Sequence, residues 1–171
     1  SKYIDLMRTI LISGASSGIG LKIAHKQLKE GNRVSAGIRD LESLEGSIID
    51  PRNWPNEQLI LNKYDALDKN SSKNWISNTV KSFGSFDTLI NSAGILSKVP
   101  FLYKDDDLDE IDKTMKINFL AVWDLTRLCW EYLSSSKNGR IISIVSMSGK
   151  RSKGNLAAYS CSKFALMSIC Q

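Results

Sequence analysis

The chain has 171 residues, a formal net charge of +5, 42% apolar residues and 24% charged residues. This length fits one domain with a substantial core, and the composition is that of an ordinary globular protein. Its apolar runs are all shorter than the ~18–20 residues of a membrane span, and residues 1–8 lack the apolar region of a secretory signal. We therefore expect a cytoplasmic protein that has no contact with a membrane.

Metal chemistry and nucleic-acid binding are both disfavoured. His25 is the only histidine, and Cys129, Cys161 and Cys170 show no metal-ligand spacing, so neither a metal site nor a His-based triad is expected. We interpret the cysteines as reduced thiols packed in or near the core, with a reactive surface thiol as the alternative. Lys and Arg are scattered without a basic run, which argues against nucleic acid as a partner, although the positive charge suits a phosphate-bearing ligand.

Apolar runs alternate with longer segments of helical period along the whole chain. This alternation is typical of a parallel sheet with helices on both faces. The first expected helix carries Ile19, Ile23, Ala24 and Leu28 on one face and ends at Gly31. Strands are expected at 9–13, 33–38, 59–63, 86–91 and 140–146, and helices at 19–30, 41–49 (a weak pattern), 68–83, 108–135 and from 157 onward.

The end of the chain lacks the usual stop signals. Residues 51–55 are expected to form a loop, and Asp106 or Asp107 is placed to cap the helix over 108–135. Gln171 then falls inside the last expected helix, with no Gly or Pro stop and no following strand. We therefore expect a chain truncated at its C-terminus, whose fifth strand is an exposed sheet edge.

A glycine-rich turn lies between the first expected strand and the first helix. Gly14, Gly18 and Gly20 follow the spacing Gly-x-x-x-Gly-x-Gly, and Ser16 and Ser17 add hydroxyl donors. Glycine lets the backbone approach a pyrophosphate closely, while the helix N-terminus offers free N–H groups and the positive end of a dipole. The sequence predicts a dinucleotide site here, with a turn that needs glycine only for its shape as the alternative.

Residues at the ends of the second and third expected strands are candidates for contacts with the nucleotide. Arg39 follows the second strand, where the adenosine ribose lies in this layout, and Arg can pair with a 2′-phosphate. NADP(H) is therefore preferred and NAD(H) is the alternative, since Asp40 comes next and Arg39 can also be simply solvated. Asp65 ends the third strand and can accept a hydrogen bond from the adenine amino group or begin a turn.

Small residues close the fourth strand in the run Asn91-Ser92-Ala93-Gly94. Ala93 and Gly94 let a nucleotide lie against the backbone, and Asn91 can brace the neighbouring strands through its amide. A turn built of ordinary turn-forming residues is the alternative interpretation.

A second constellation lies near the end of the chain. Tyr159 and Lys163 are four residues apart, so they share a face of a helix, and a nearby cation stabilises a phenolate. Ser146 ends the fifth expected strand at its carboxyl edge, where ligands of α/β proteins bind. Its hydroxyl can hold a substrate oxygen while the phenol exchanges a proton. A Tyr-x-x-x-Lys pair alone is weak, because a core tyrosine beside a surface lysine also produces it.

Together with Asn118 in Lys-Ile-Asn-Phe, these motifs resemble the short-chain dehydrogenase/reductase family, in its branch with the Gly-x-x-x-Gly-x-Gly turn. The resemblance covers the chain from about Thr9 to its end. It implies that Tyr159 is the catalytic acid/base, that Lys163 binds the nicotinamide ribose and assists the tyrosine, and that Asn118 supports a water in the proton relay. The cofactor site would comprise Gly14, Ser16, Ser17, Gly18, Ile19, Gly20, Arg39, Asp65, Asn91, Ala93, Gly94, Tyr159 and Lys163.

We therefore predict an α/β, Rossmann-like three-layer sandwich with a parallel sheet in the order 3-2-1-4-5, forming one NAD(P)-binding domain over residues 1–171. Ser13 replaces the family's usual Thr and Ser92 its usual second Asn. The expected activity interconverts a carbonyl and an alcohol on a small molecule by hydride transfer with NADP(H). A homodimer or homotetramer is expected of the full-length protein. A non-catalytic NAD(P)-binding protein, and an isomerase or dehydratase of the same family, are the alternatives.

Overall fold

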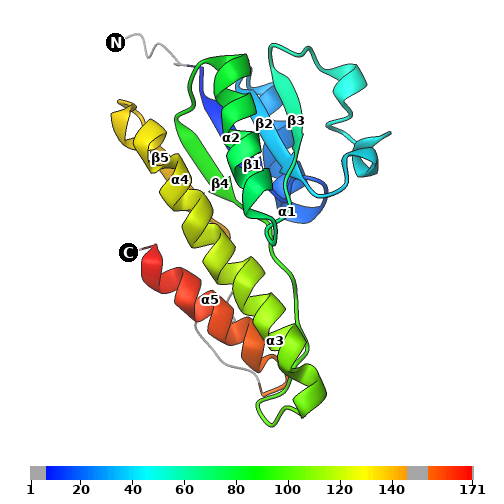
Figure 1. Ribbon diagram of the computed structural model, residues 1–171. Coiled ribbons are helices and arrows are strands. Elements are labelled where there is room, and N and C mark those ends of the chain that lie inside the picture. Colours follow the sequence, from blue (N-terminus) through cyan, green and yellow to red (C-terminus); the bar gives the residue numbers. More distant parts are fainter. Residues whose placement is uncertain (1–6, 146–153, 171) are drawn as a thin grey trace.

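The computed structural model describes residues 7–145 and 154–170 (Figure 1). Within these residues, five parallel strands form one sheet in the order β3-β2-β1-β4-β5, as predicted. The strands are β1 (Thr9–Ser13), β2 (Arg33–Ile38), β3 (Leu59–Lys63), β4 (Thr88–Asn91) and β5 (Arg140–Ser143). The helices are α1 (Gly18–Lys29), α2 (Lys69–Phe83), α3 (Leu108–Met115), α4 (Ala121–Ser135) and α5 (Ala157–Ile169).

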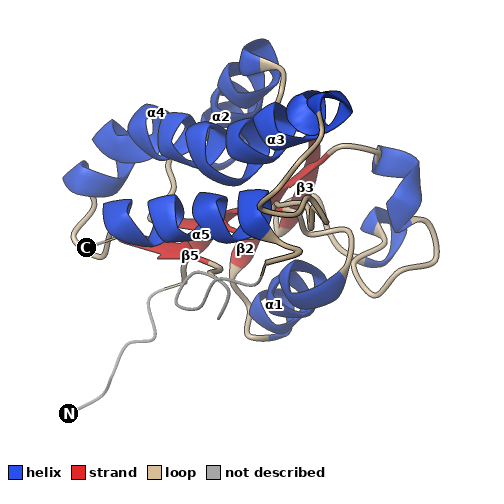
Figure 2. Cartoon of the chain, turned by 90° about the horizontal axis from the view of Figure 1, so that it is seen from below, coloured by secondary structure: helices blue, strands red, loops and turns tan. Residues whose placement is uncertain are grey.

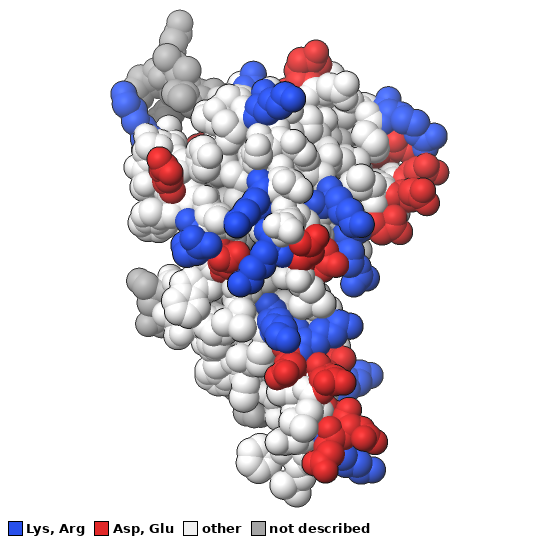
Figure 3. All heavy atoms as spheres, in the orientation of Figure 1, with Lys and Arg blue, Asp and Glu red and all other residues white. Residues whose placement is uncertain are grey.

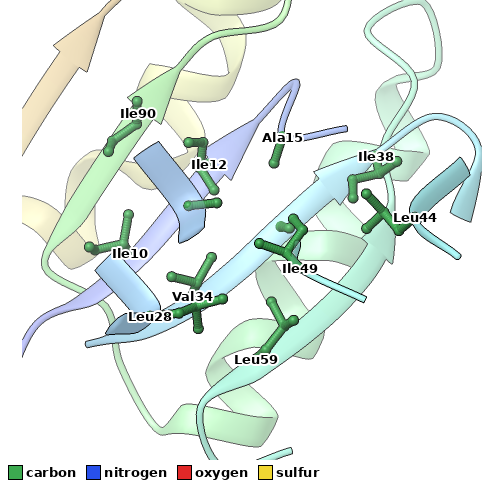
Figure 4. Packing of buried hydrophobic residues seen from close by; sticks show 12 residues of the cluster. Ile10, Ile12, Ala15, Leu28, Val34, Ile38, Leu44, Ile49, Leu59 and Ile90 are labelled. Carbon is green, nitrogen blue, oxygen red and sulfur yellow. The ribbon is translucent and has the colours of Figure 1, made fainter. Parts of the chain in front are cut away.

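Helices cover both faces of the sheet, which gives three layers (Figure 2). Ile10 and Ile12 of β1 face α1 and pack with its Leu28, as Figure 4 shows. Leu11, between them in β1, faces the opposite way and packs with Trp75 of α2 and the buried residues of α4. Alternate side chains of a strand thus enter two separate cores, one on each face of the sheet. The central strands are therefore apolar at almost every position.

The expected helix over 108–135 is not continuous. It consists of α3, a π-helical turn at Lys116–Leu120, and α4. Wide turns of this kind are rare and are frequently found at functional sites. Asp107 does not cap α3 through its side chain; its carboxylate accepts the Lys104 N–H at 2.8 Å and closes the preceding 3₁₀ turn.

The segment between β2 and β3 also differs from the expectation. Of the expected helix over 41–49, only Leu41–Leu44 is helical, as a short 3₁₀ turn that Asp40 caps at its N-terminus, and Gly46 follows it at φ +72°. A second 3₁₀ turn, Pro51–Asn53, lies where a loop was expected. Asp50 is buried below it, and the neighbouring Arg52 guanidinium holds the pKa of this carboxyl well below its usual range.

Smaller differences concern strand ends and single side chains. Residues 86 and 87 precede β4, and β5 ends at Ser143, although the Ile144 N–H still bonds to the Asn91 carbonyl at 2.9 Å. Ile19 is 59% exposed, which contradicts its predicted place on the core face.

The cysteine interpretation is correct for Cys129, which is buried between α4 and the sheet, and wrong for the other two. Cys161 and Cys170 are exposed, since the inward face of α5 is taken by Ser162, Lys163 and Leu166. None of the helices in the described part of the chain is long and apolar enough to cross a membrane. On the face in Figure 3, Lys and Arg are interspersed with Asp and Glu.

Candidate active site

The glycine turn after β1 is built by close backbone contacts. Gly14 and Gly18 have φ values of +67° and +57°, in the left-handed region that favours glycine. A Cβ placed on Gly14 would lie 2.7 Å from the backbone of Ala93, and one on Gly20 would meet the Gly14 carbonyl oxygen. The turn therefore presses directly against the end of β4, and a side chain at Gly14 or Gly20 would push the two apart.

The N-terminus of α1 opens from this turn. Ser17 is its N-cap residue, in extended conformation, and its side chain makes no capping hydrogen bond. The first turn of α1 contains no acidic residue. Its N–H groups and the Ser17 hydroxyl are thus available to an anionic group, which the positive end of the helix dipole favours.

A cleft of about 440 Å³ runs along the carboxyl ends of β1, β2 and β4 from this turn. Its volume lies within the ~300–1,000 Å³ of small-molecule and cofactor sites. Its lining consists of Gly14, Ser16, Ser17, Gly18, Ile19, Gly37, Ile38, Arg39, Tyr64, Asp65, Ala66, Ser92, Ala93, Gly94, Ile95, Ile117 and Ile144. The exposed Ile19 is therefore part of the cleft wall.

Arg39 and Asp65 line the part of the cleft that lies at the ends of β2 and β3. Arg39 is exposed and makes no ion pair with any residue of the described segments. The carboxylate of Asp40, by contrast, accepts the Glu42 N–H at 3.1 Å and so is held by its own turn. One oxygen of Asp65 likewise accepts the Leu67 N–H at 2.9 Å, so Asp65 forms a turn as well as lining the cleft.

Two polar side chains brace the strand ends beneath the cleft. The amide of Asn91 is buried and lies within 3.3 Å of the Ser143 hydroxyl on β5 and 3.4 Å of Thr126 on α4, and Asn91 does not line the cleft. The Ser13 hydroxyl accepts the N–H groups of Ser92 and Ala93, each at 3.2 Å. The sequence analysis assigned Ser13 no role of its own. The one available signal was that Ser13 keeps the hydroxyl of the Thr that is usual in the family.

Asn118 lies in the π-helical turn and is fully buried. Its side chain accepts the Ile95 N–H at 2.8 Å and donates to the Ile95 carbonyl at 2.8 Å. The wide turn thus points the amide at the loop after β4. A position so close to Gly94 and Ile95 was not visible in the sequence, where Asn118 is one polar residue inside a helix.

Lys163 reaches the same end of the cleft from α5. It is 7% exposed, and its ammonium donates to the carbonyl of Ile144, which lines the cleft, at 3.3 Å. Burial lowers the pKa of Lys163 from its usual value. The Lys163 Nζ lies 5.9 Å from the centre of the Tyr159 ring, so the structure brings the two members of the motif together on one side of α5.

Gly94 is the point at which these groups converge. A Cβ built on it would lie 3.1 Å from the Asn118 Oδ1 and 3.5 Å from the Lys163 Nζ. Asn118 and Lys163 therefore lie beside the end of the cleft that Gly94 lines, although neither of them nor Tyr159 lines the cleft itself. Ser146, the remaining predicted catalytic residue, lies outside the described residues.

The chain is similar to known proteins along almost its whole length. The family model described as short chain dehydrogenase matches residues 8–171. Agropine synthesis reductase from Rhizobium rhizogenes is 37% identical over 92% of this chain and 35% of its own length. 11-beta-hydroxysteroid dehydrogenase A from Sesamum indicum is 30% identical over 93% of this chain and 45% of its own length. The chain thus spans about a third to a half of these two curated relatives.

Solved structures share the same fold. A short-chain dehydrogenase from Streptomyces avermitilis superposes with a TM-score of 0.85 at 23% identity, covering 95% of this chain and 58% of that chain. A short-chain dehydrogenase/reductase described as glucose/ribitol dehydrogenase, from Brucella melitensis, gives a TM-score of 0.84 at 26% identity, covering 95% of this chain and 64% of that one.

Proposed function

We propose, since the chain belongs to the short-chain dehydrogenase family, that the full-length protein interconverts a carbonyl and an alcohol on a small molecule with a nicotinamide dinucleotide. The observation that carries this proposal is the convergence at Gly94, where a backbone without a side chain meets the Asn118 amide and the Lys163 ammonium. Such a point suits a flat ring that must lie against the backbone beside a cation.

The residues present fit a dinucleotide. The close contact of Gly14 with the Ala93 backbone holds the turn against the end of β4, and the uncapped N-terminus of α1 offers N–H groups to a pyrophosphate. Ser16, Ser17 and Gly18 would hold the phosphates, Asp65 and Ala66 the adenine end, and Ala93 to Ile95 the nicotinamide end. When bound, the nicotinamide supplies or accepts the hydride.

The chain's own residues would move the proton. Tyr159 would donate it to the substrate oxygen in the reducing direction and take it back in the other. Lys163 would favour the charged form of the phenol through its ammonium, which is held in place by the Ile144 carbonyl. Asn118 would fix the loop that carries Gly94 and Ile95. Ser146 would orient the carbonyl, a role proposed from the sequence.

We further propose that NADP(H) is the preferred cofactor. Arg39 lines the cleft after β2 and is free of any ion pair within the described segments, whereas Asp40 is turned to its own backbone. A 2′-phosphate near Arg39 would gain a charge-assisted hydrogen bond that NAD(H) lacks. A cytoplasmic location and a homodimer or homotetramer of the full-length protein stay predictions.

Turnover with a panel of aldehydes and ketones tests the proposed function. Full-length protein is incubated with NADPH or NADH, and the loss of nicotinamide absorbance is followed with and without each carbonyl. We expect carbonyl-dependent oxidation that is faster with NADPH at subsaturating cofactor. Cofactor binding without oxidation across a broad panel would favour the non-catalytic alternative, and product without net oxidation would favour an isomerase or dehydratase.

A further inference from the structure

A buried hydroxyl links two members of the proposed catalytic group. Ser162 of α5 is fully buried, directly before Lys163 in the sequence. Its Oγ donates to the Tyr159 carbonyl at 2.7 Å, and the Nδ2 of Asn118 donates to the same Oγ at 3.2 Å. One side chain therefore contacts both the backbone of the tyrosine and the amide in the π-helical turn.

The hydrogens at this point are all accounted for. A serine hydroxyl has one hydrogen, and because it goes to the Tyr159 carbonyl, Ser162 must accept from Asn118. The Asn118 amide has two hydrogens, of which the other goes to the Ile95 carbonyl, while its Oδ1 accepts the Ile95 N–H. Without the Ser162 hydroxyl, one N–H of a fully buried amide would lose its partner in this network.

We propose that Ser162 is a positioning residue, which joins the helix of Tyr159 to the loop of Gly94 and Ile95 through the Asn118 amide. The chain of contacts runs from the Tyr159 carbonyl to Ser162, to Asn118, and to both backbone groups of Ile95. It fixes the separation between the phenol and the backbone against which the nicotinamide would lie. The catalytic part of this assignment rests on the proposed function.

Ordinary helix chemistry accounts for only half of these contacts. Serines in helices often donate to the carbonyl three or four residues earlier, and Ser168 on the same helix does so to Ala165 at 2.7 Å. Ser168 is exposed and makes no other side-chain hydrogen bond in the described segments. The bond from Asn118 is therefore what distinguishes Ser162, and Ser168 provides a matched control.

The experiment compares Ser162→Ala with Ser168→Ala in the full-length protein. Two quantities are measured: kcat for the best carbonyl substrate beside the cofactor Kd, and the hydrogen-exchange rate of the Ile95 amide. For Ser162→Ala we expect kcat to fall about tenfold, the typical effect of one lost hydrogen bond, with less than a threefold change in cofactor Kd. We also expect about tenfold faster exchange at Ile95, because its acceptor on Asn118 is loosened. Ser168→Ala should change neither quantity.

Several results would overturn the proposal. If the Ile95 amide exchanges at the same rate in Ser162→Ala as in Ser168→Ala, no such link exists. An equal loss of kcat and cofactor affinity would show a merely structural residue. If Ser162→Ala does not fold, Ser162→Cys keeps the shape with a weak donor and acceptor, and wild-type kcat and exchange in that variant would equally refute it. A wild-type protein without carbonyl turnover refutes the proposed function instead, and the exchange at Ile95 still tests the link.

Discussion

The two ends of the cleft are built from different kinds of groups. At the glycine turn the cleft wall is backbone: Gly14 and Gly18 take left-handed conformations, and a Cβ on Gly14 would collide with Ala93. Beside the other end, near Gly94, the groups are side chains, the buried amide of Asn118 and the buried ammonium of Lys163. The glycine turn requires residues without a Cβ atom. The side-chain cluster requires hydrogen-bond partners for its buried amide and ammonium groups.

This difference separates binding from chemistry. A backbone cradle preorganises N–H groups without side-chain entropy, so changes there should alter the affinity for the cofactor. The side-chain cluster holds the groups that are proposed to move a proton, so changes there should alter turnover while the cofactor still binds. Substitutions that cross this division would contradict the assignment of the two ends.

The largest expected effect is on turnover, from Tyr159→Phe. The ring volume is kept and the phenol oxygen is lost, so full-length enzyme should lose kcat by about 10²–10⁴, as is usual for general acid–base groups, and bind NADPH nearly as before. Tyr103→Phe, at a tyrosine that is 49% exposed in the segment between β4 and α3, is the control and should have wild-type kcat. Near-normal turnover of Tyr159→Phe would remove the tyrosine from the mechanism.

Gly14→Ala should affect the opposite quantity. The left-handed conformation costs a non-glycine residue ~1–2 kcal/mol, and the new Cβ must also displace Ala93. We expect the cofactor Kd to rise about 100-fold, as measured by fluorescence titration. Gly31→Ala has the same type of φ, +83°, at the other end of α1, with nothing within 4 Å of the added Cβ. It should lower the Tm and leave the Kd unchanged; a similar Kd change in both would mean that general destabilisation is responsible.

Arg39→Ala should discriminate between the two cofactors. A charge-assisted bond is worth ~1.5–3 kcal/mol, so the NADPH Kd should rise about tenfold or more while the NADH Kd stays within a factor of two. Arg33→Ala removes the same charge at the opposite end of β2, where Arg33 lies over the Phe83 ring, and should change neither. Equal losses for NADPH and NADH with Arg39→Ala would show that Arg39 does not read the 2′-phosphate.

The sheet and the backbone end of the cleft could be predicted from the sequence, for a physical reason. Parallel strands buried on both faces, such as β1 and β2, are nearly continuous apolar runs, and glycine marks the positions where a side chain cannot fit. Gly31 and Gly84 end α1 and α2 in left-handed conformations, as glycine after a helix predicts. Local signals of this kind need no knowledge of distant contacts.

At the side-chain end, the Tyr159–Lys163 pair could be predicted from its spacing, whereas Asn118 could be predicted only through the family resemblance. The π-helical turn at Lys116–Leu120 was not visible in the sequence, and the partner of its Asn118 is Ile95, 23 positions away. Ser162 was not singled out, because a serine beside a lysine is uninformative until the partner helix is placed. The error at Cys161 has the same origin: which face of α5 turns inward depends on the packing, and a small thiol fits either face.

The smallest expected effect concerns stability, and it tests whether the side-chain end is costly to the fold. Burial lowers the pKa of Lys163, so the folded form binds this proton less tightly than the unfolded chain does. The penalty is complete at pH values below the folded pKa and fades as the pH rises toward the ordinary value of 10.5. Lys163→Met removes the charge, and we expect a Tm higher by about 2–4 °C at pH 7, in line with ~1 kcal/mol for a domain of this size.

The difference between Lys163→Met and wild type should shrink as the pH approaches 10.5, and turnover should be lost at every pH. Lys113→Met, at an exposed lysine of α3, is the control and should shift the Tm little. A lower Tm for Lys163→Met at pH 7 would mean that the hydrogen bond from Lys163 to the Ile144 carbonyl outweighs the cost of burying the ammonium. The side-chain end would then stabilise the fold, and the contrast between the two ends would be confined to their chemistry.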